Sequence, residues 1–202
     1  HSTSRRQRQM CIRDRIINNY MIKAMEEIGD RFQRQQAYVP ELLMAARAMK
    51  GSLELLKPHL KGEKTDTIGK IVIGTVFGDL HDIGKNLVAS MFEGCGFEVV
   101  NMGVNISADK FVETVKIEKP DILCLSALLT TTMSYMKVVM DALEKEGLRD
   151  QVKVMVGGAP VNELFANQIG ADGYSGNANA AVIKAKELLC ICLLYTSDAA
   201  DD

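Results

Sequence analysis

The sequence predicts an α/β fold in which a five-stranded parallel sheet follows a partial bundle of helices. Three observations support this prediction. From residue 70 onward, short apolar runs alternate with segments whose apolar residues recur at helical spacing. The short runs are apolar almost throughout, which is typical of parallel strands that are covered on both faces. In residues 16–60, only helical spacing is found. The expected strand order is 2-1-3-4-5, the flavodoxin-like (Rossmann-like) arrangement.

Composition and charge exclude several classes of protein. The chain has 202 residues, of which 47% are apolar and 25% are charged, with a net charge of −2. No apolar run approaches the roughly 18 residues of a membrane span, and the charge does not indicate a nucleic-acid surface. The five cysteines are odd in number and form no C-x-x-C pair. We therefore expect reduced thiols in a cytoplasmic protein, with no membrane or nucleic-acid partner.

The two ends of the chain differ from the middle. Residues 1–15 carry five arginines and one acidic residue, and residues 190–202 continue past a helical pattern without a cap. Either end could be a real arm or tail. Both resemble translated adapter sequence, so we expect non-native tails and leave them out of the fold prediction.

Residues 16–60 are predicted to form two helices, and the second follows Pro40, which is acceptable in a first helical turn. Residues 61–69 are polar and contain glycine, as expected of a linker. Residues 70–189 then form the α/β domain. Its strands are expected within residues 70–78, 96–103, 121–129, 153–158 and 173–175. Helical patterns follow each strand, and Ser107 is a suitable N-cap for the second of these helices.

Three unusual loops follow the first, third and fourth strands. They are GDLHDIGKN (78–86), SALLTTT (126–132) and GGAP (157–160). In an open parallel sheet, ligands bind at the carboxyl ends of the strands, near the point where the strand order reverses. These loops therefore predict a ligand site at that edge.

The first loop does not fit a phosphate site. A P-loop has four residues between its glycines and a Ser or Thr after the lysine, whereas this loop has five residues and Asn86. His81 offers different chemistry, because Asp79 can accept one ring N–H and leave the other nitrogen free for a metal. An ordinary zinc site needs three or four ligands, but the other histidines are His1 and His59. Either His81 is a solvated loop histidine, or a tetrapyrrole-type ring supplies the remaining ligands.

The motifs resemble a known family. Asp79-x-His81-x-x-Gly84, then Ser126-x-Leu128, then Gly157-Gly158 resemble the cobalamin-binding domain. The segments GDLHDIGKNLV, SALLTTTM and VPELLMAARAMK resemble, more specifically, the small corrinoid proteins of methylotrophic methyltransferase systems. These proteins serve methylamines, methanol or methoxylated substrates in methanogenesis and in anaerobic bacteria, and are related to the cobalamin module of methionine synthase.

The resemblance implies roles for single residues. His81 would be the lower axial ligand of cobalt through Nε2, displacing the cofactor's own base (base-off, His-on). Asp79 would orient His81 through a hydrogen bond. Thr132 would extend this relay of hydrogen-bonded side chains, and Gly84 would allow a tight turn beneath the ring. Further cofactor contacts are implied in the sheet domain at Gly78, Leu80, Asp82, Ser126, Leu128, Thr130, Gly157, Gly158 and Ala178, and in the helical segment at Phe32, Val39 and Leu42.

The resemblance also implies a function. The protein would carry a methyl group on cobalamin, as methylcobalamin, and would not act as a catalyst alone. Its partners would be a substrate-specific methyltransferase, a second methyltransferase that uses coenzyme M or tetrahydrofolate, and a reductive activation protein. Residues 16–60 would be a truncated version of the family's helical cap. The alternatives are a cobalamin-dependent light-sensing regulator and a response-regulator-like signalling domain.

Overall fold

The computed structural model describes residue 16, residues 20–56 and residues 67–190. The expected tails therefore lie outside the described residues, apart from residue 190. So does most of the expected linker, of which residues 67–69 are described. Among the described residues, no helix combines the length and the apolar character needed to cross a membrane.

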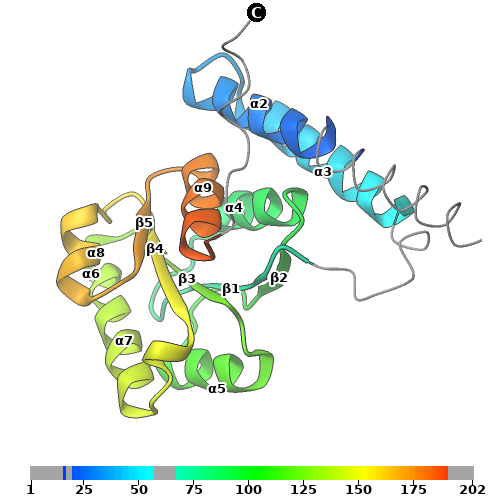
Figure 1. Cartoon of the computed structure of the whole chain (residues 1–202). Coiled ribbons are helices and arrows are strands. Elements are labelled where there is room, and N and C mark those ends of the chain that lie inside the picture. The colour runs from blue at the N-terminus through cyan, green and yellow to red at the C-terminus, as the bar shows by residue number, and fades with distance from the viewer. Residues whose placement is uncertain (1–15, 17–19, 57–66, 191–202) are drawn as a thin grey trace, which may run out of the picture.

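Five parallel strands form one sheet, in the predicted order β2-β1-β3-β4-β5 (Figure 1). The strands are β1 (Lys70–Thr75), β2 (Glu98–Asn101), β3 (Ile122–Ser126), β4 (Lys153–Gly157) and β5 (Gly173–Ser175). The flavodoxin-like prediction is confirmed. Most of the strands are shorter than the predicted runs, because the apolar residues continue into the loops at their carboxyl ends.

Helices cover both faces of the sheet. Along β1, Ile71 and Ile73 belong to one buried cluster and Val72 to the other, as the alternation of side chains along a strand requires. One face carries α4 (Ile83–Gly94) and α9 (Ala178–Leu188). The other carries α5 (Ala108–Glu118), α7 (Tyr135–Lys145) and α8 (Glu163–Ile169), with the short elements α6 (Thr130–Met133) and η3 (Arg149–Gln151) beside them.

Two helices form an additional layer outside α4 and α9 (Figure 1). These are α2 (Ile22–Gln33) and α3 (Val39–Leu56). Pro40 lies in the first turn of α3, as predicted, and the N–H of Tyr38 donates to Glu41 Oε2 (2.8 Å), which satisfies a donor at the helix start. Leu42 is fully buried in the same cluster as residues of α4 and α9, so this pair of helices rests on the sheet domain.

Polar contacts also join this layer to the sheet domain. The buried Lys186 of α9 pairs with Glu26 of α2 (3.0 Å), and Lys50 of α3 pairs with Glu93 of α4 (2.8 Å). Gly29 lies so close to Asn179 of α9 that a Cβ there would come within 2.2 Å of the Asn179 Oδ1. A larger residue at position 29 would therefore displace α2 or the buried Asn179 side chain.

Candidate functional site

The loop after β1 begins with a tight turn. The N–H of Asp79 donates to the carbonyl of Val76 (3.2 Å), and Gly78 is the third residue of this turn with a φ of +83°. A positive φ at the third position defines a type II turn, which favours glycine. Gly78 was predicted from the sequence to contact the cofactor. In the structure it forms this turn and is not among the residues that line the cavity described below.

The Asp79 carboxylate receives five hydrogen bonds. Oδ1 accepts from the main-chain N–H of His81 (3.0 Å) and contacts Nδ1 of the His81 ring (2.7 Å). Oδ2 accepts from the Leu128 N–H (2.7 Å), the Leu129 N–H (3.4 Å) and the Thr132 hydroxyl (2.7 Å). The loop after β3 thus supplies three donors to a side chain of the loop after β1.

These contacts fix the charge of Asp79. The side chain is fully buried, and burial alone would raise its pKa. The hydrogen bonds from Leu128, Thr132 and His81 outweigh burial and hold the pKa of this carboxyl well below its ordinary range. Asp79 is therefore a buried anion whose negative charge is directed at His81.

The His81 side chain faces the open side of this arrangement and is 51% exposed. Because Nδ1 contacts a carboxylate, the proton of the neutral ring belongs on Nδ1 and the lone pair on Nε2. Across the described parts of the chain, no hydrogen bond to Nε2 is found. The same residues contain no cluster of three or more His, Cys, Asp or Glu side chains that could hold a metal ion.

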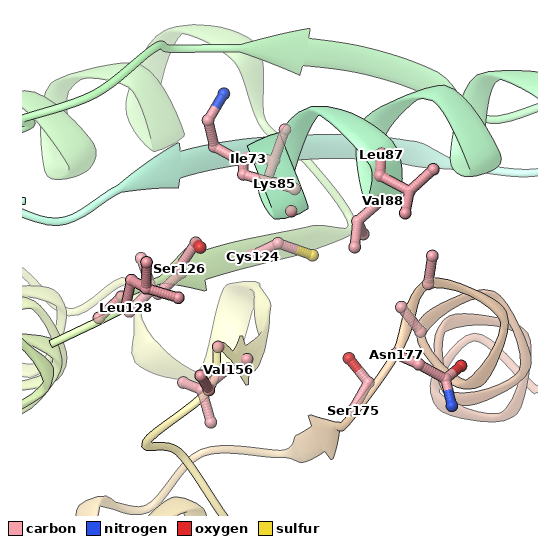
Figure 2. Close-up of a pocket in the computed structure, with 18 of the residues that line it drawn as sticks. Ile73, Lys85, Leu87, Val88, Cys124, Ser126, Leu128, Val156, Ser175 and Asn177 are labelled. Atoms are coloured by element: carbon pink, nitrogen blue, oxygen red, sulfur yellow. The ribbon is translucent and has the colours of Figure 1, made fainter. Parts of the chain in front are cut away.

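A cavity of about 660 Å³ opens beside His81 at the carboxyl ends of the strands. Its walls come from the start of α4, the ends of β3, β4 and β5, and the start of α9. Figure 2 shows Leu87 and Val88 of α4 across from Ser175 and Asn177, with Cys124 and then Ser126 to one side along β3. The position agrees with the prediction from the three loops.

Ten of the predicted site residues line this cavity. They are Phe32, Leu80, His81, Asp82, Gly84, Ser126, Leu128, Gly157, Gly158 and Ala178. Gly158 has a φ of +132°, and a Cβ there would meet the carbonyl oxygen of Ala127 at 1.8 Å. Glycine is therefore required where the loop after β4 passes the end of β3.

Gly84 does not form the tight turn that the sequence analysis expected. It lies in the first turn of α4, its φ is not positive, and a Cβ there would have no neighbour within 4 Å. The missing side chain instead leaves space at the wall of the cavity. The turn expected here is made by Val76–Asp79, five residues earlier.

Three other predicted contacts are not at the cavity. Leu42 is buried between α3 and the sheet domain, and Val39 is partly exposed at the start of α3. Thr130 is exposed at the start of α6. Of the predicted residues in the helical segment, Phe32 alone lines the cavity, because α2 and α3 pack on α4 and α9. Asp79 and Thr132 lie behind His81 and do not line it.

Lys85 is buried, and no role was predicted for it from the sequence. Its Nζ donates to Asn101 of β2 (2.6 Å) and to Asn86 (2.7 Å), and Asn86 donates to Asp82 (2.9 Å). Burial lowers the pKa of Lys85, and the charge of Asp82 opposes this effect. The aliphatic part of Lys85 lines the cavity while its ammonium group ties α4 to the edge strand β2.

Other lining residues also went unpredicted, among them Ile73, Cys124, Met155, Tyr174, Asn177 and Ala181. Asn177 could have been recognised as a helix N-cap, because Asn is a preferred residue there. In the structure its side chain accepts from the Ala180 N–H at the start of α9 (2.8 Å). The others lie in strands and helices, where an apolar residue of the core and one that lines a cavity look alike in sequence.

Family models match two parts of the chain. A model described as a B12 binding domain matches residues 69–183. A second model with the same description matches residues 9–57.

Known corrinoid proteins are similar to the chain over most of its length. The chain is 46% identical to a dimethylamine corrinoid protein of Methanosarcina barkeri over 86% of this chain and 82% of that protein. It is 44% identical to trimethylamine corrinoid protein 2 of Methanosarcina mazei, over 86% and 81% of the two chains.

Among solved structures, a cobalamin-binding protein from Desulfitobacterium hafniense has a TM-score of 0.75 and 36% identity, over 92% of this chain and 90% of that chain. The methanol:cobalamin methyltransferase complex of Methanosarcina barkeri has a TM-score of 0.74 and 31% identity, over 87% and 67%.

Proposed function

Because the chain belongs to the family of B12-binding corrinoid proteins of methylamine methyltransferase systems, we propose that it carries a methyl group on a bound corrinoid between two methyltransferases. The observation that supports this function best is the Asp79–His81 pair at the mouth of the cavity. It presents an imidazole Nε2, backed by a buried anion, at the edge of the sheet where ligands bind.

The residues at the site fit a corrinoid. The cavity has small residues at Gly84, Ser126, Gly157 and Ala178, so an extended arm of a cofactor can enter between α4 and α9. Next to it, Leu80 and Ile83 expose apolar side chains, suitable contacts for the underside of a large ring. A bound corrinoid would supply the cobalt that accepts and releases the methyl group.

His81 would hold the cobalt through Nε2, in the base-off, His-on mode. Asp79 keeps the imidazole in the tautomer that leaves Nε2 free and strengthens it as a donor. Because the lowered pKa of Asp79 keeps its carboxylate ionised, the partner of His81 Nδ1 is a charged group.

The Thr132 hydroxyl has two acceptors within reach. It lies 2.7 Å from Asp79 Oδ2 and 3.0 Å from the carbonyl oxygen of Leu129. A hydroxyl carries one proton, so Thr132 can donate to either acceptor. We propose that it donates to Asp79 and so extends the relay that would hold His81 as a cobalt ligand.

The partners we propose are a substrate-specific methyltransferase, a second methyltransferase to coenzyme M or tetrahydrofolate, and a reductive activation protein. Two similar proteins are named for dimethylamine and trimethylamine, and one similar structure is that of a methyltransferase complex. These names favour a methylamine as the source of the methyl group.

Among the described residues, no specific feature favours a light sensor, and β3 ends in Ser126, where a response regulator would need an acidic phosphoacceptor.

The proposal is tested by spectroscopy of the protein reconstituted with cobalamin. Electron paramagnetic resonance of the Co(II) form should show coupling to one axial nitrogen, and labelling histidines with ¹⁵N should change that coupling. His81→Ala should lose this signal while keeping bound cofactor, and His59→Ala serves as the control histidine. An axial signal in the natural protein that is insensitive to the histidine label, or a label-sensitive signal that survives in His81→Ala, would contradict the assignment.

A further inference from the structure

The main chain of His81 is held by a residue that the sequence analysis did not single out. Thr75 is fully buried at the end of β1, and its hydroxyl donates to the carbonyl oxygen of His81 (3.0 Å). A buried hydroxyl is costly unless it finds a partner. Here the partner is the main chain of the proposed cobalt ligand, six positions further along the sequence.

Thr75 is itself firmly fixed. It lies in β1 with β2 and β3 on either side, and it pairs with Ser126 in the register of the sheet. Its N–H donates to Gly103 (3.0 Å), and its carbonyl accepts from the N–H of Ile106 (3.0 Å). Since a β-branched side chain is also stiff about χ1, the Thr75 hydroxyl has little freedom to move.

Both peptide groups that flank the Cα of His81 are therefore hydrogen-bonded. The N–H donates to Asp79 Oδ1 (3.0 Å), and the carbonyl accepts from Thr75 Oγ1 (3.0 Å). Behind them, Asn105 accepts from the N–H of Gly78 (2.8 Å) and donates its own N–H to the carbonyl of Asp79 (3.0 Å). The main chain of His81 is thus held on both sides, and Asp79 Oδ1 holds the ring through Nδ1 (2.7 Å).

We propose that Thr75 is a positioning residue that fixes the main chain of His81, so that Nε2 would reach a bound cobalt from one position. This inference deepens the proposed function and depends on it for the role of His81. The hydroxyl group carries this role, and the methyl group of Thr75 contributes only to packing.

Two substitutions separate the hydroxyl from the methyl group. Thr75→Val keeps the shape of the side chain and loses the hydrogen bond, whereas Thr75→Ser keeps the hydroxyl and loses the methyl group. A positioning role predicts that Ser behaves like the natural protein and Val does not. A packing role predicts the reverse order. If Thr75→Val does not fold, Thr75→Ala takes its place, because it also lacks the hydroxyl.

The first measurement uses the protein without cofactor, so its outcome does not depend on the proposed function. Nuclear magnetic resonance should show a changed carbonyl ¹³C shift at His81 in Thr75→Val. Exchange of the His81 amide proton should be faster by about fivefold, the factor expected for the loss of one net hydrogen bond. Thr75→Ser should match the natural protein in both. Unchanged His81 signals in Thr75→Val and Thr75→Ala would overturn the proposal.

The second measurement uses protein reconstituted with cobalamin. In Thr75→Val, the axial nitrogen coupling of the Co(II) form should weaken or split into several populations, and Thr75→Ser should restore the single coupling. If the natural protein shows no histidine coupling at all, the proposed function fails, whatever the exchange data show. If the natural protein shows the coupling and Thr75→Val retains it unchanged, the positioning role of Thr75 fails alone.

Discussion

Asp79 Oδ1 lies 2.7 Å from His81 Nδ1, but the exposed fractions of the two side chains are 0% and 51%. The pair therefore joins the interior of the protein to its surface. The buried member is held by donors from the loop after β3, and the other ring nitrogen of the exposed member has no hydrogen bond within the described residues. Changes made to the buried residue should consequently be measurable at the exposed one.

Asp79→Asn should make the Co(II)/Co(I) potential of the reconstituted protein less negative, because Nε2 becomes a weaker donor to Co(II). Loss of such a partner typically costs 10–100-fold in metal affinity, and for one electron tenfold corresponds to 59 mV, so a shift on the order of 60–120 mV is expected. Thr132→Ala should act in the same direction and more weakly. Spectroelectrochemical titration measures both. Asp82→Asn is the matched control, and a larger shift there would mean that the wrong carboxylate was chosen.

Asp79 should also make the stability of the cofactor-free protein depend on pH. Its folded pKa lies below the ordinary value of 3.8. The unfolded chain therefore takes up the proton first as the pH falls. The stabilisation is fully present above the unfolded pKa and is lost on acidification.

Urea unfolding of the natural protein and of Asp79→Asn measures this effect. The difference should be on the order of 2–3 kcal/mol near neutral pH, the value of charged hydrogen bonds, and should shrink below about pH 4. A constant difference across this range would show that the ionised carboxylate is not the source.

Two glycine substitutions should have opposite consequences. Gly158→Ala places a Cβ 1.8 Å from the carbonyl oxygen of Ala127 at a φ of +132°, so it should destabilise the fold by several kcal/mol, of the order known for strain and overpacking.

Gly84→Ala meets no neighbour within 4 Å and should leave the cofactor-free protein equally stable, or up to ~1 kcal/mol more stable. Its methyl group should nevertheless lower the affinity for cobalamin, because Gly84 lines the cavity. Thermal unfolding and cobalamin titration separate the two effects, and unchanged affinity in Gly84→Ala would contradict the proposed site.

The contact between α2 and α9 should control how readily the outer helices separate from the sheet domain. Glu26→Gln leaves the buried Lys186 without its carboxylate and should destabilise this contact by about 1–2 kcal/mol, less than for a fully buried pair because Glu26 is 47% exposed. Lys186→Met removes the charge and should cost less.

Limited proteolysis between residues 20 and 56 provides the measurement. The exposed pair Lys50–Glu93 supplies the control, since Lys50→Met should change the stability by less than ~0.5 kcal/mol. Equal cleavage rates in Glu26→Gln and Lys50→Met would show that the Glu26–Lys186 pair does not hold the outer helices.

The sequence determined the fold and the centre of the site. The alternation of apolar runs and helical spacing from residue 70 onward predicted five strands, the helices between them and the strand order. The spacing of Asp79 and His81 predicted their contact, because two residues in one turn meet through local geometry. Such features depend on neighbours along the chain and can therefore be recognised in a single sequence.

Tertiary structure decided which distant residues meet. Leu42 was assigned to the cofactor and is part of the packing of α3 on α4 and α9, whereas Phe32 reaches the cavity. Both are apolar residues at helical spacing, and the sequence contains no signal that separates them. The choice depends on how the outer helices pack against the sheet domain.

The same reason explains Gly84 and Thr75. Glycine in the loop motif indicated a turn, but the turn lies earlier and Gly84 begins a helix beside the cavity. Thr75 looked like an ordinary strand residue, and only the folding of residues 76–81 back over the end of β1 brings its hydroxyl to the His81 carbonyl. Local spacing determines which elements form and which near neighbours pair. Contacts between elements arise from the packing of the whole chain, and local sequence patterns do not reveal them.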